Sequence, residues 1–538
     1  MRGLMMDWQL TIRSIVERAA RFFPQKEIIT RVPGGLHRYT YADVARRVER
    51  LASALAALGV RPGDRVGTFA WNTYRHLELY LAVPSSGAVL HTVNIRLFPE
   101  QIAYIINHAA DAVLFVDDVL VAQLEPHAAE LKTVRAFVVM GNGALPDTRL
   151  APVHRYEDLL AAAPDTFDWP ALDEQQAAGM CYTSGTTGHP KGVVYSHRAL
   201  VLHCFAQAMA DTFALSELDR VLSVVPMFHA NAWGLPFSAT MVGASQVYPG
   251  VQPTPRDLAQ LIQDLRVTVT AGVPTVLLGL LQVLEYERFD LSSLRAVPCG
   301  GSAVPESLLA RFDALGIDVI QAWGMTETAP LATVSRPRST MAGWSPEQLR
   351  AVRAKQGTPL PAVEVRVVGE TGTPLAWDGK SVGELEVRGP WVAASYHEDP
   401  RSADAFHDGW FRTGDVVTID PEGYVQITDR AKDVIKSGGE WISSVELENL
   451  IIGHPHVLEA AVIGLAHERW QERPLACVVV KPGQTLTREG ILDYLTPRVA
   501  RWWLPDDVVF VESLPKTSVG KLAKRELRKQ FAGHRWPE

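Results

Sequence analysis

Apolar residues recur at the spacing of one helix face between residues 40 and 58. Valine or leucine stands at every third or fourth position, which is the period of an amphipathic α-helix. These positions are Val44, Val48, Leu51, Leu55 and Leu58. Thr40 can cap the start of such a helix, and Gly59 can end it. A turn at residues 62–64 and a short apolar run at 65–70 then predict a β-strand.

Similar helix and strand signals alternate through the first part of the chain. They fall at residues 78–83, 99–108, 113–116, 134–140, 196–210, 221–225, 267–273, 296–301 and 319–321. Such alternation is typical of an α/β domain built on a mainly parallel sheet. Residues 145–170 are rich in proline, alanine and aspartate, and they predict a loose connection that contains one short helix.

The pattern changes after Gly357. Short strands separated by turns are predicted at residues 364–368, 383–388, 416–420 and 424–428, which indicates a small antiparallel barrel or sheet. The charged residues 429–432 suit a linker. A compact α/β unit follows, with strands near 459–465, 476–480 and 508–511 and a helix near 488–495. We therefore predict an α/β fold with three parts: a large N-terminal domain of several subdomains at 1–428, a hinge at 429–433, and a small α/β domain at 434–538.

Length and composition fit this division. The chain has 538 residues, more than a single hydrophobic core organises. Apolar residues make up 47% and charged residues 21%, an ordinary globular composition. The formal net charge of −8 argues against nucleic acid as the main partner, because phosphate binding needs a basic surface. A local basic patch for an anionic cofactor is compatible with this balance.

The cysteines and the chain ends bear on the compartment. Four cysteines lie far apart and show no metal-ligand spacing: Cys181, Cys204, Cys299 and Cys477. We expect buried thiols in a reducing compartment. Residues 1–10 lack the apolar core of a signal peptide, no apolar run is long enough to cross a membrane, and the last three residues form no peroxisomal signal. The expected location is the cytoplasm, with no membrane span.

The clearest candidate for chemistry is the segment 182–192, Tyr-Thr-Ser-Gly-Thr-Thr-Gly-His-Pro-Lys-Gly. Glycines let backbone N–H groups approach an anion, hydroxyls add donors, and Lys191 adds a mobile charge. Apolar residues on both sides predict a strand, a phosphate-binding loop and a second strand. Pro190 separates glycine from lysine, so this is not a Walker loop. A Ser/Thr/Gly-rich surface turn is the simpler alternative for such a segment taken alone.

This segment resembles the signature loop of the acyl-adenylate-forming (AMP-binding) superfamily, which includes acyl-CoA synthetases, peptide-synthetase adenylation domains and firefly luciferase. Further motifs of that superfamily follow in its order: W-G-M-T-E at 323–327, G-E-L-E-V-R-G-P at 383–390, T-G-D at 413–415, D-R-A-K-D-V-I-K-S-G-G-E-W-I at 429–442 and P-K-T-S-V-G-K at 515–521. Together they cover nearly the whole chain. The segments M-F-H-A-N-A-W at 227–233 and K-S-G-G-E-W-I-S at 436–443 most resemble bacterial medium- and long-chain fatty acyl-CoA synthetases.

The resemblance implies ATP-dependent ligation of a fatty acid to coenzyme A (CoA). A carboxylate oxygen would attack the α-phosphate of ATP, which gives an acyl-adenylate and pyrophosphate, and the CoA thiol would then displace AMP. Mg²⁺, held by Thr183 and Glu327, would assist, since it prefers hard oxygen ligands. The small C-terminal domain would rotate between the two half-reactions. Similar bacterial enzymes are often homodimers, so a homodimer is expected.

The resemblance also assigns roles to single residues. Lys521 would neutralise charge at the α-phosphate and carboxylate, Asp415 would accept the ribose hydroxyls, and Thr326 would lie at the α-phosphate. The nucleotide would contact Thr183, Ser184, Gly185, Thr186, Thr187, Gly188, Lys191, Gly301, Gln321, Ala322, Trp323, Thr326, Asp415, Arg430, Lys432, Lys436 and Trp441. The acid would contact His229, Ala230, Trp233 and Gly301, and the CoA loop would comprise Ser437, Gly438, Gly439 and Glu440. The expected catalytic residues are Lys521, Thr183, Glu327 and Lys436.

Two departures from the superfamily pattern and several alternatives stay open. Trp323 stands where tyrosine or phenylalanine is commoner, and Ala322 where many relatives have glycine, so the shape of the adenine pocket is undecided. Taken singly, Asp415 suits a turn, Glu327 a helix N-terminus, Lys521 a solvated surface and Trp233 the core. The acid could be a short thioether acid, such as methylmercaptopropionate, or an aryl acid.

Two rival functions use the same motifs. A luciferase-like monooxygenase also starts from an acyl-adenylate, and CoA-dependent thioester formation without light or O₂ uptake separates it from a ligase. A nucleotide-binding regulatory protein with an inactive site is the other rival. Pyrophosphate release separates that protein from an enzyme.

Overall fold

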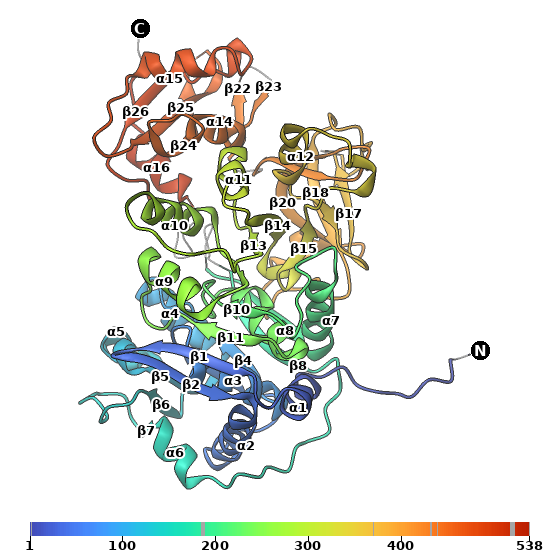
Figure 1. Cartoon of the computed structure of the whole chain (residues 1–538), viewed down its shortest axis with the longest axis vertical. Coiled ribbons are helices and arrows are strands. Elements are labelled where there is room, and N and C mark those ends of the chain that lie inside the picture. Colours follow the sequence, from blue (N-terminus) through green and yellow to red (C-terminus); the bar gives the residue numbers. More distant parts are fainter. Residues whose placement is uncertain are drawn as a thin grey trace. The chain divides into compact units, whose positions relative to one another are not determined.

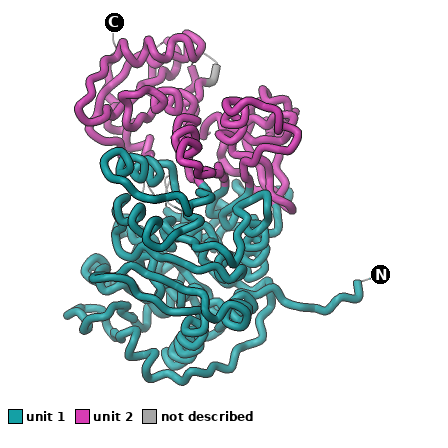
Figure 2. Tube along the Cα trace, viewed as in Figure 1, with its two compact units in different colours: residues 1–298, 324–332, 389–409 teal, residues 299–323, 333–388, 410–538 magenta. Residues whose placement is uncertain are grey.

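The computed structural model describes residues 1, 3–183, 189–369, 371–430, 433–437, 440–467, 469–516 and 522–536. They form two compact units, shown in different colours in Figure 2. Unit 1 comprises residues 1–298, 324–332 and 389–409, and unit 2 comprises residues 299–323, 333–388 and 410–538. Both units combine helices with sheets, which confirms the predicted α/β class.

A seven-stranded sheet of unit 1 carries the signature segment (Figure 1). Its strand order is β7–β6–β5–β3–β4–β8–β9, and all neighbours are parallel except the antiparallel pair β8 and β9. The strands are β3 (Arg65–Phe69), β4 (Val89–Thr92), β5 (Asp111–Asp117), β6 (Ala136–Met140), β7 (Val153–Arg155), β8 (Ala177–Tyr182) and β9 (Gly192–Ser196). β4, β5 and β6 are buried along their whole length, as expected of parallel strands covered on both faces. The two strands predicted on either side of the signature segment are confirmed as β8 and β9.

A second sheet carries the strands β13, β12, β10, β11, β1 and β2, in that order. The strands are β1 (Glu27–Val32), β2 (Gly35–Thr40), β10 (Arg220–Leu222), β11 (Ser245–Tyr248), β12 (Val269–Thr270) and β13 (Ala296–Cys299). Its strands run parallel, apart from the hairpin of β1 and β2 at the edge. β10 and β12 are shorter than the predicted strands at 221–225 and 267–273, and β1 and β2 were not predicted.

The helices of unit 1 pack around these sheets. They are α1 (Ile12–Phe22), α2 (Tyr41–Ala57), α3 (Tyr74–Ser85), α4 (Pro99–Ala109), α5 (Val121–Leu124), α6 (Tyr156–Ala162), α7 (His197–Ala208), α8 (Leu235–Val242), α9 (Pro255–Leu265), α10 (Pro274–Tyr286) and α13 (Ser402–Ala405). Short 3₁₀ turns are η1 (Asp118–Leu120), η2 (Glu125–Glu130), η3 (Ala230–Gly234) and η4 (Thr326–Thr328), and β19 (Phe406–His407) is a two-residue strand. Thr40 caps α2 as predicted and forms a capping box with Asp43. α6 is the short helix predicted within residues 145–170.

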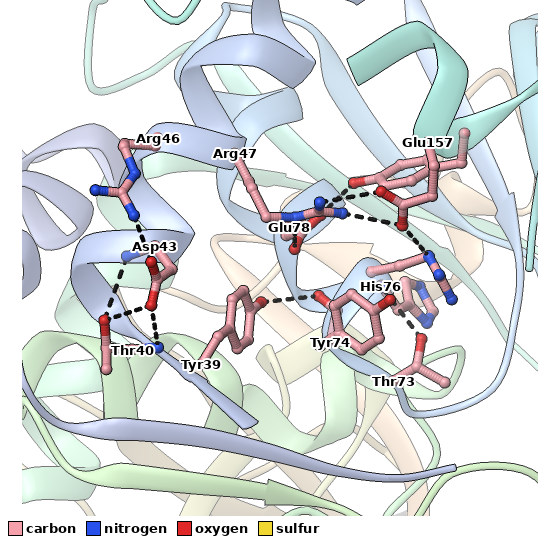
Figure 3. Close-up of polar contacts among 12 residues, drawn as sticks. Tyr39, Thr40, Asp43, Arg46, Arg47, Thr73, Tyr74, His76, Glu78 and Glu157 are labelled. Carbon is pink, nitrogen blue, oxygen red and sulfur yellow. Dashed lines mark hydrogen bonds and ion pairs between the residues drawn. The ribbon is translucent and has the colours of Figure 1, made fainter. Parts of the chain in front are cut away.

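A buried ionic network holds α2, α3 and α6 together (Figure 3). The guanidinium of Arg47 donates to Glu78 at 2.7 Å and to both carboxylate oxygens of Glu157 at 3.0 and 3.1 Å. Arg75 donates to Glu157 at 2.7 Å, and the hydroxyl of Tyr156 donates to Glu78 at 2.5 Å. Burial raises the pKa of Glu78 despite the nearby Arg47. At Glu157 burial also acts to raise the pKa, but the bonds from the two arginines outweigh it and the net shift is downward.

Unit 2 contains the predicted antiparallel sheet. Its strands β17 (Glu364–Val368), β18 (Gly383–Arg388), β20 (Trp410–Ile419) and β21 (Val425–Arg430) pair with their neighbours in that order. The unit also holds β16 (Thr358–Pro359), β14 (Asp318–Gly324) except its last residue, and the last two residues of β15 (Leu331–Val334). Its helices before residue 430 are α11 (Glu306–Asp313), α12 (Pro346–Arg353) and the 3₁₀ turn η5 (Ser339–Met341).

The C-terminal part of unit 2 is an α/β module, as predicted. The strand order of its sheet is β23–β22–β25–β24, and β26 pairs with β25 in parallel. The elements are β22 (Ile435–Ser437), β23 (Glu440–Ile442), β24 (Val457–His467), β25 (Gln471–Val480), β26 (Asp507–Phe510), α14 (Ser444–Ile452), α15 (Arg488–Leu495), α16 (Lys524–Gln530) and η6 (Arg501–Trp503). α15 has the predicted bounds.

The first two residues of the predicted linker belong to a strand. Asp429 and Arg430 are the last two residues of β21, and Asp429 is fully buried. Its carboxylate accepts hydrogen bonds from the backbone N–H and the hydroxyl of Ser444, at 2.7 and 2.6 Å. A charge run had suggested solvent exposure, but here the first charge meets the N-terminus of α14. The hinge at 429–433 and the domain limits at 428 and 434 stay predictions.

All four cysteines are buried free thiols, as predicted. Among the described residues, no helix is long and apolar enough to span a membrane.

Candidate active site

The two ends of the signature segment are tied to each other. The backbone N–H of Thr183 donates to the carbonyl of Lys191 at 2.9 Å, and the backbone N–H of Lys191 donates to the hydroxyl of Thr183 at 3.1 Å. Gly192 lies so close to β8 that a Cβ atom there would come within 2.8 Å of Met180. The intervening residues Ser184, Gly185, Thr186, Thr187 and Gly188 lie outside the described residues. The reciprocal bonds hold Thr183 and Lys191 next to each other.

A hydrogen-bonded chain starts from the lysine of this segment. The Nζ atom of Lys191 donates to the hydroxyl of Tyr396 at 2.9 Å and lies 4.0 Å from the centre of the tyrosine ring. The Tyr396 hydroxyl donates to the carboxylate of Glu327 at 2.8 Å. Burial, and then the charge of Glu327, raise the pKa of Tyr396, so the phenol stays neutral and keeps its proton to donate. Burial lowers the pKa of Lys191, and the charge of Glu327 acts in the opposite direction.

The sequence did not single out Tyr396. It lies six residues beyond the motif at 383–390, in a segment without regular periodicity. Its only signal is a lone aromatic residue among polar ones, which also suits a surface loop. The contacts of Tyr396 with Lys191 and Glu327 become visible only in the folded unit 1, which includes residues 389–409.

The segment around Glu327 is held by backbone contacts. The hydroxyl of Tyr195 donates to the carbonyl of Thr326 at 2.7 Å, and the N–H of Ala393 donates to the carbonyl of Glu327 at 2.8 Å. A Cβ atom at Gly324 would come within 1.7 Å of the Pro330 carbonyl oxygen, so only glycine fits there. The glycine of the W-G-M-T-E motif therefore has a packing reason. The buried Glu327 carboxylate is fixed from both its backbone and its side chain.

Thr183 and Glu327 offer a hydroxyl and a carboxylate, the hard oxygen donors that Mg²⁺ prefers. No group of three or more His, Cys, Asp or Glu residues that could hold a metal ion occurs among the described residues. Mg²⁺ commonly binds through one or two protein oxygens together with substrate phosphates. The donor set present therefore fits Mg²⁺ held jointly with a polyphosphate, rather than a site made by protein ligands alone.

Unit 2 carries a second polar constellation. The indole N–H of Trp323 donates to one carboxylate oxygen of Asp415 at 2.9 Å, and the guanidinium of Arg430 lies 2.6 Å from the other oxygen. Asp415 is fully buried and Trp323 is nearly so. Asp415 is thus no ordinary turn residue. A carboxylate has about four lone-pair positions, so two ribose hydroxyls can still be accepted.

Neighbouring motifs shape this constellation. The hydroxyl of Thr413 donates to the carbonyl of Leu385 at 2.8 Å, and the N–H of Asp415 donates to the same hydroxyl at 3.1 Å. Gly414 adopts a φ of +71°, which favours glycine, and its N–H donates to Glu384 at 3.2 Å. The T-G-D and G-E-L motifs therefore lie on the paired strands β20 and β18, where the register between the two strands is irregular.

Three further predicted nucleotide residues lie in unit 2, one on the loop before α11 and two on β14. Gln321 is buried, and its side-chain oxygen accepts from the N–H of Val304 at 3.0 Å. Gly301 has a φ of +83°. Ala322 is buried between Gln321 and Trp323 on β14.

The predicted acid-binding residues His229, Ala230 and Trp233 lie in unit 1, between β10 and α8. β10 ends at Leu222, so the strand predicted at 221–225 stops short of this segment. Instead it forms the turn η3, in which Ala230 and Trp233 have φ angles of +43° and +57°. Ala230 is buried, whereas His229 and Trp233 are partly exposed.

The predicted CoA loop lies in the C-terminal module. Lys436 and Ser437 end β22, whose backbone pairs with β23. The Lys436 side chain is exposed, and the buried Ser437 hydroxyl accepts from Arg473 at 3.0 Å. Gly438, Gly439, Lys432 and Lys521 lie outside the described residues, as do the side chains of Glu440 and Trp441. The structure thus brings together Thr183, Lys191, Thr326 and Glu327 in unit 1, and Trp323, Asp415 and Arg430 in unit 2.

Comparisons with known proteins agree with these motifs. A family model described as AMP-binding enzyme matches residues 16–397, and one described as AMP-binding enzyme C-terminal domain matches residues 446–521. The chain is 50% identical over 534 residues to a long-chain-fatty-acid–CoA ligase of Thermus thermophilus, covering 98% of this chain and 97% of the relative. It is 46% identical over 535 residues to a medium-chain-fatty-acid–CoA ligase of Ectopseudomonas oleovorans, covering 99% and 98%.

A solved structure extends the agreement to the fold. The crystal structure of an anthranilate CoA ligase in complex with anthranoyl-AMP matches with a TM-score of 0.88 and 27% identity. The match covers 98% of this chain and 99% of that one.

Proposed function

The chain belongs to the AMP-binding enzyme family, and we propose that it ligates a medium- or long-chain fatty acid to CoA with ATP. The products are the acyl-CoA thioester, AMP and pyrophosphate. The observation that carries this proposal is the chain Lys191–Tyr396–Glu327 beside the tied ends of the signature loop. It supplies one cation and one carboxylate at a place where polyphosphate and metal must both be held.

Each group of this chain has a task in adenylation. Lys191 rests on a neutral hydroxyl, so it can exchange that partner for a phosphate oxygen at little electrostatic cost. Tyr396 keeps the Glu327 carboxylate in place during the exchange. Mg²⁺, when bound through Glu327 and Thr183, supplies neutralisation of the phosphate charge. Phosphoryl transfer depends mainly on such positioning and charge neutralisation.

The nucleoside end is proposed to bind at Trp323 and Asp415. Asp415 would accept the ribose hydroxyls, while its bonds to Trp323 and Arg430 keep its orientation fixed. The Trp323 ring, oriented by the same bond, would flank adenine together with Gln321 and Ala322. Gly301, Lys432, Lys436 and Trp441 complete the proposed nucleotide contacts.

The two half-reactions are proposed to use different faces of the C-terminal domain, beyond a hinge at 429–433. Lys521 would serve adenylation, and the loop Ser437–Glu440 would serve CoA. Replacing Lys521 by alanine should lower adenylation on the order of 10²-fold. Thioester formation from preformed acyl-adenylate should be much less affected, and equal losses in both steps would contradict the two-face arrangement.

The acid is proposed to bind along His229, Ala230, Trp233 and Gly301. The names of the two relatives support an aliphatic chain, since both act on fatty acids. An aryl acid is the second candidate, favoured by the likeness to the anthranilate ligase structure. A short thioether acid completes the alternatives.

A substrate panel tests the proposal. AMP formation is measured with ATP, Mg²⁺, CoA and each acid from C3 to C18, with methylmercaptopropionate and with anthranilate. We expect the highest kcat/KM between C8 and C16. If kcat/KM is highest for the aryl or the thioether acid, that acid replaces the fatty acid as the proposed substrate. If no acid gives AMP, the proposed ligase activity is wrong.

We further propose that the enzyme works in the cytoplasm as a homodimer. Four buried free thiols suit a reducing compartment. The dimer rests on the resemblance alone, and light scattering of the purified chain measures it directly.

A further inference from the structure

The turn η3 has an unusual backbone. Four consecutive residues that are not glycine, Ala230 to Trp233, have φ angles of +43°, +55°, +51° and +57°. This is the left-handed region, where Cβ crowds the following carbonyl oxygen and each such residue is strained. Single residues visit it occasionally, but runs of them do not. Such a run persists only when surrounding contacts fix it.

One buried side chain fixes the far end of the turn. Gln207, in the last turn of α7, is fully buried. Its amide N–H donates to the carbonyl of Trp233 at 2.6 Å, and its amide oxygen accepts from the hydroxyl of Ser238. The Ser238 hydroxyl also contacts the carbonyl of Gly234 at 3.1 Å. Only a side chain that donates on one side and accepts on the other, such as the Gln207 amide, can make both of these hydrogen bonds.

The contacts on either side of Trp233 fix its backbone, whereas its side chain is partly exposed. Gly234 has a φ of +78°, and a Cβ there would come within 2.7 Å of the His203 ring, so the backbone after Trp233 is tightly packed. At the near end, the thiol of Cys181 donates to the Asn231 side chain at 3.4 Å. The Trp233 side chain is partly exposed. The backbone is therefore held firmly at Trp233, while part of its side chain stays exposed.

We propose that Gln207 is a positioning residue that sets the chain-length preference of the enzyme by holding Trp233 in the strained turn. The inference rests on the proposed function, in which residues 229–233 line the acid site. Without the bond from Gln207, the strained backbone relaxes and the indole loses its fixed position. The ring then no longer discriminates between acids whose chains reach it and acids whose chains do not.

The test compares two buried glutamines. Gln207→Met keeps the side-chain length and removes both hydrogen bonds. Gln246→Met is the matched control, because Gln246 is also fully buried and bonds Tyr41, Thr240 and Tyr248, none of which belongs to the turn. The readouts are the melting temperature and the ratio of kcat/KM for C16 and C8 acids.

We expect both variants to melt earlier, but only Gln207→Met to change the ratio, by about tenfold, the effect of one lost hydrogen bond. The change should reproduce the ratio of Trp233→Ala, and Gln207→Met should add nothing further in that background. Ser238→Ala, which frees the amide oxygen only, should shift the ratio part of the way. This milder variant decides the matter if Gln207→Met fails to fold.

Three outcomes would overturn the inference: an unchanged ratio in Gln207→Met, or in Ser238→Ala if Gln207→Met fails to fold; an equal change in Gln246→Met; or independent effects of Gln207→Met and Trp233→Ala. Failure of the proposed function looks different. The wild-type enzyme would then form no acyl-CoA from either acid, whereas failure of this inference alone leaves the wild-type activity intact.

Discussion

The two polar constellations of this protein hold a carboxylate in different ways. In unit 1, Glu327 receives a hydrogen bond from a neutral tyrosine, and the cation Lys191 sits one step further along. In unit 2, Asp415 is held directly by the indole of Trp323 and the guanidinium of Arg430. The first arrangement leaves both charges able to take new partners, while the second fixes the orientation of its carboxylate and leaves lone pairs open for hydroxyl donors.

The difference fits what each place must bind. Under the proposed function, polyphosphate and Mg²⁺ would bring charge to unit 1, so the charges there must be able to change partners. A ribose brings only hydroxyls, and a carboxylate kept in one orientation selects them best. Changes in the first constellation should therefore affect turnover without stability, and changes in the second should affect both.

The largest effect is expected from Glu327→Gln. Glutamine still accepts the hydrogen bond of Tyr396, so the melting temperature should stay within a few degrees of the wild type. The negative charge is lost, and adenylation should fall on the order of 10²- to 10³-fold. The measurement is acid-dependent pyrophosphate release at saturating Mg²⁺. A loss below tenfold would mean that Glu327 does not hold the metal.

Asp415→Asn should show the mixed effect. The ion pair with Arg430 is lost, and the bond from Trp323 weakens because its acceptor is no longer charged. A hydrogen bond to a charged group contributes about 1.5–3 kcal/mol, so KM for ATP should rise roughly 10- to 100-fold. The melting temperature should fall as well. A normal melting temperature with a raised KM would erase the contrast between the two constellations.

Tyr396→Phe should be milder and confined to function. It removes the hydroxyl between Lys191 and Glu327 but keeps the ring beneath the lysine. We expect KM for ATP to rise about tenfold, as for one lost hydrogen bond. The matched control is Tyr424→Phe, which removes a hydroxyl that donates to the carbonyl of Arg336 in unit 2. Equal changes in the KM for ATP in both variants would argue against a role for the hydrogen bonds between Lys191, Tyr396 and Glu327.

The smallest effect is a pH dependence of stability. It comes from His203, which binds the backbone a few residues beyond Glu327. The ring of His203 accepts the N–H of Leu331, just beyond η4, at 3.1 Å. Burial lowers the pKa of His203 from 6.5 to about 3. Below pH 6.5 the unfolded chain binds the proton more readily. The stability from neutral His203 is therefore complete above pH 6.5 and is lost as the pH falls towards 3.

His203→Gln removes this titration. The variant should be less stable than the wild type at pH 7.5. The gap in unfolding free energy should narrow below pH 6.5 by about 1.4 kcal/mol per pH unit. Urea unfolding at pH 7.5, 6 and 5 measures it. A constant gap would mean that His203 is not held neutral by its burial.

The sequence predicted the elements whose pattern is regular and local. The period of α2, its cap at Thr40 and the bounds of α15 follow from side-chain spacing alone. It also predicted the α/β class and the antiparallel sheet, because turn residues mark their limits. β1 and β2 were missed since their residues alternate weakly, and three of the six residues of β2 are exposed.

The site was predictable where a motif carries chemistry and unpredictable where packing decides. Glu327 and Asp415 follow from motifs, whereas their partners Tyr396 and Trp323 are joined to them only by tertiary contacts across 69 and 92 residues. Asp429 shows the reverse error, because a charge in a polar run indicated solvent and the fold buries it. The left-handed turn at 230–233 had little signal, since only Asn231 among its four residues is of a type that favours that conformation.

The central claim is that Lys191 and Glu327 of unit 1 hold the phosphates of ATP and Mg²⁺, so that an acid attacks the α-phosphate. It is tested most directly by exchange of labelled pyrophosphate into ATP without CoA. The account predicts exchange that requires both Mg²⁺ and a fatty acid, with octanoate and palmitate both active. Exchange that is absent, or that proceeds equally without acid, would contradict it, as would release of ADP in place of AMP.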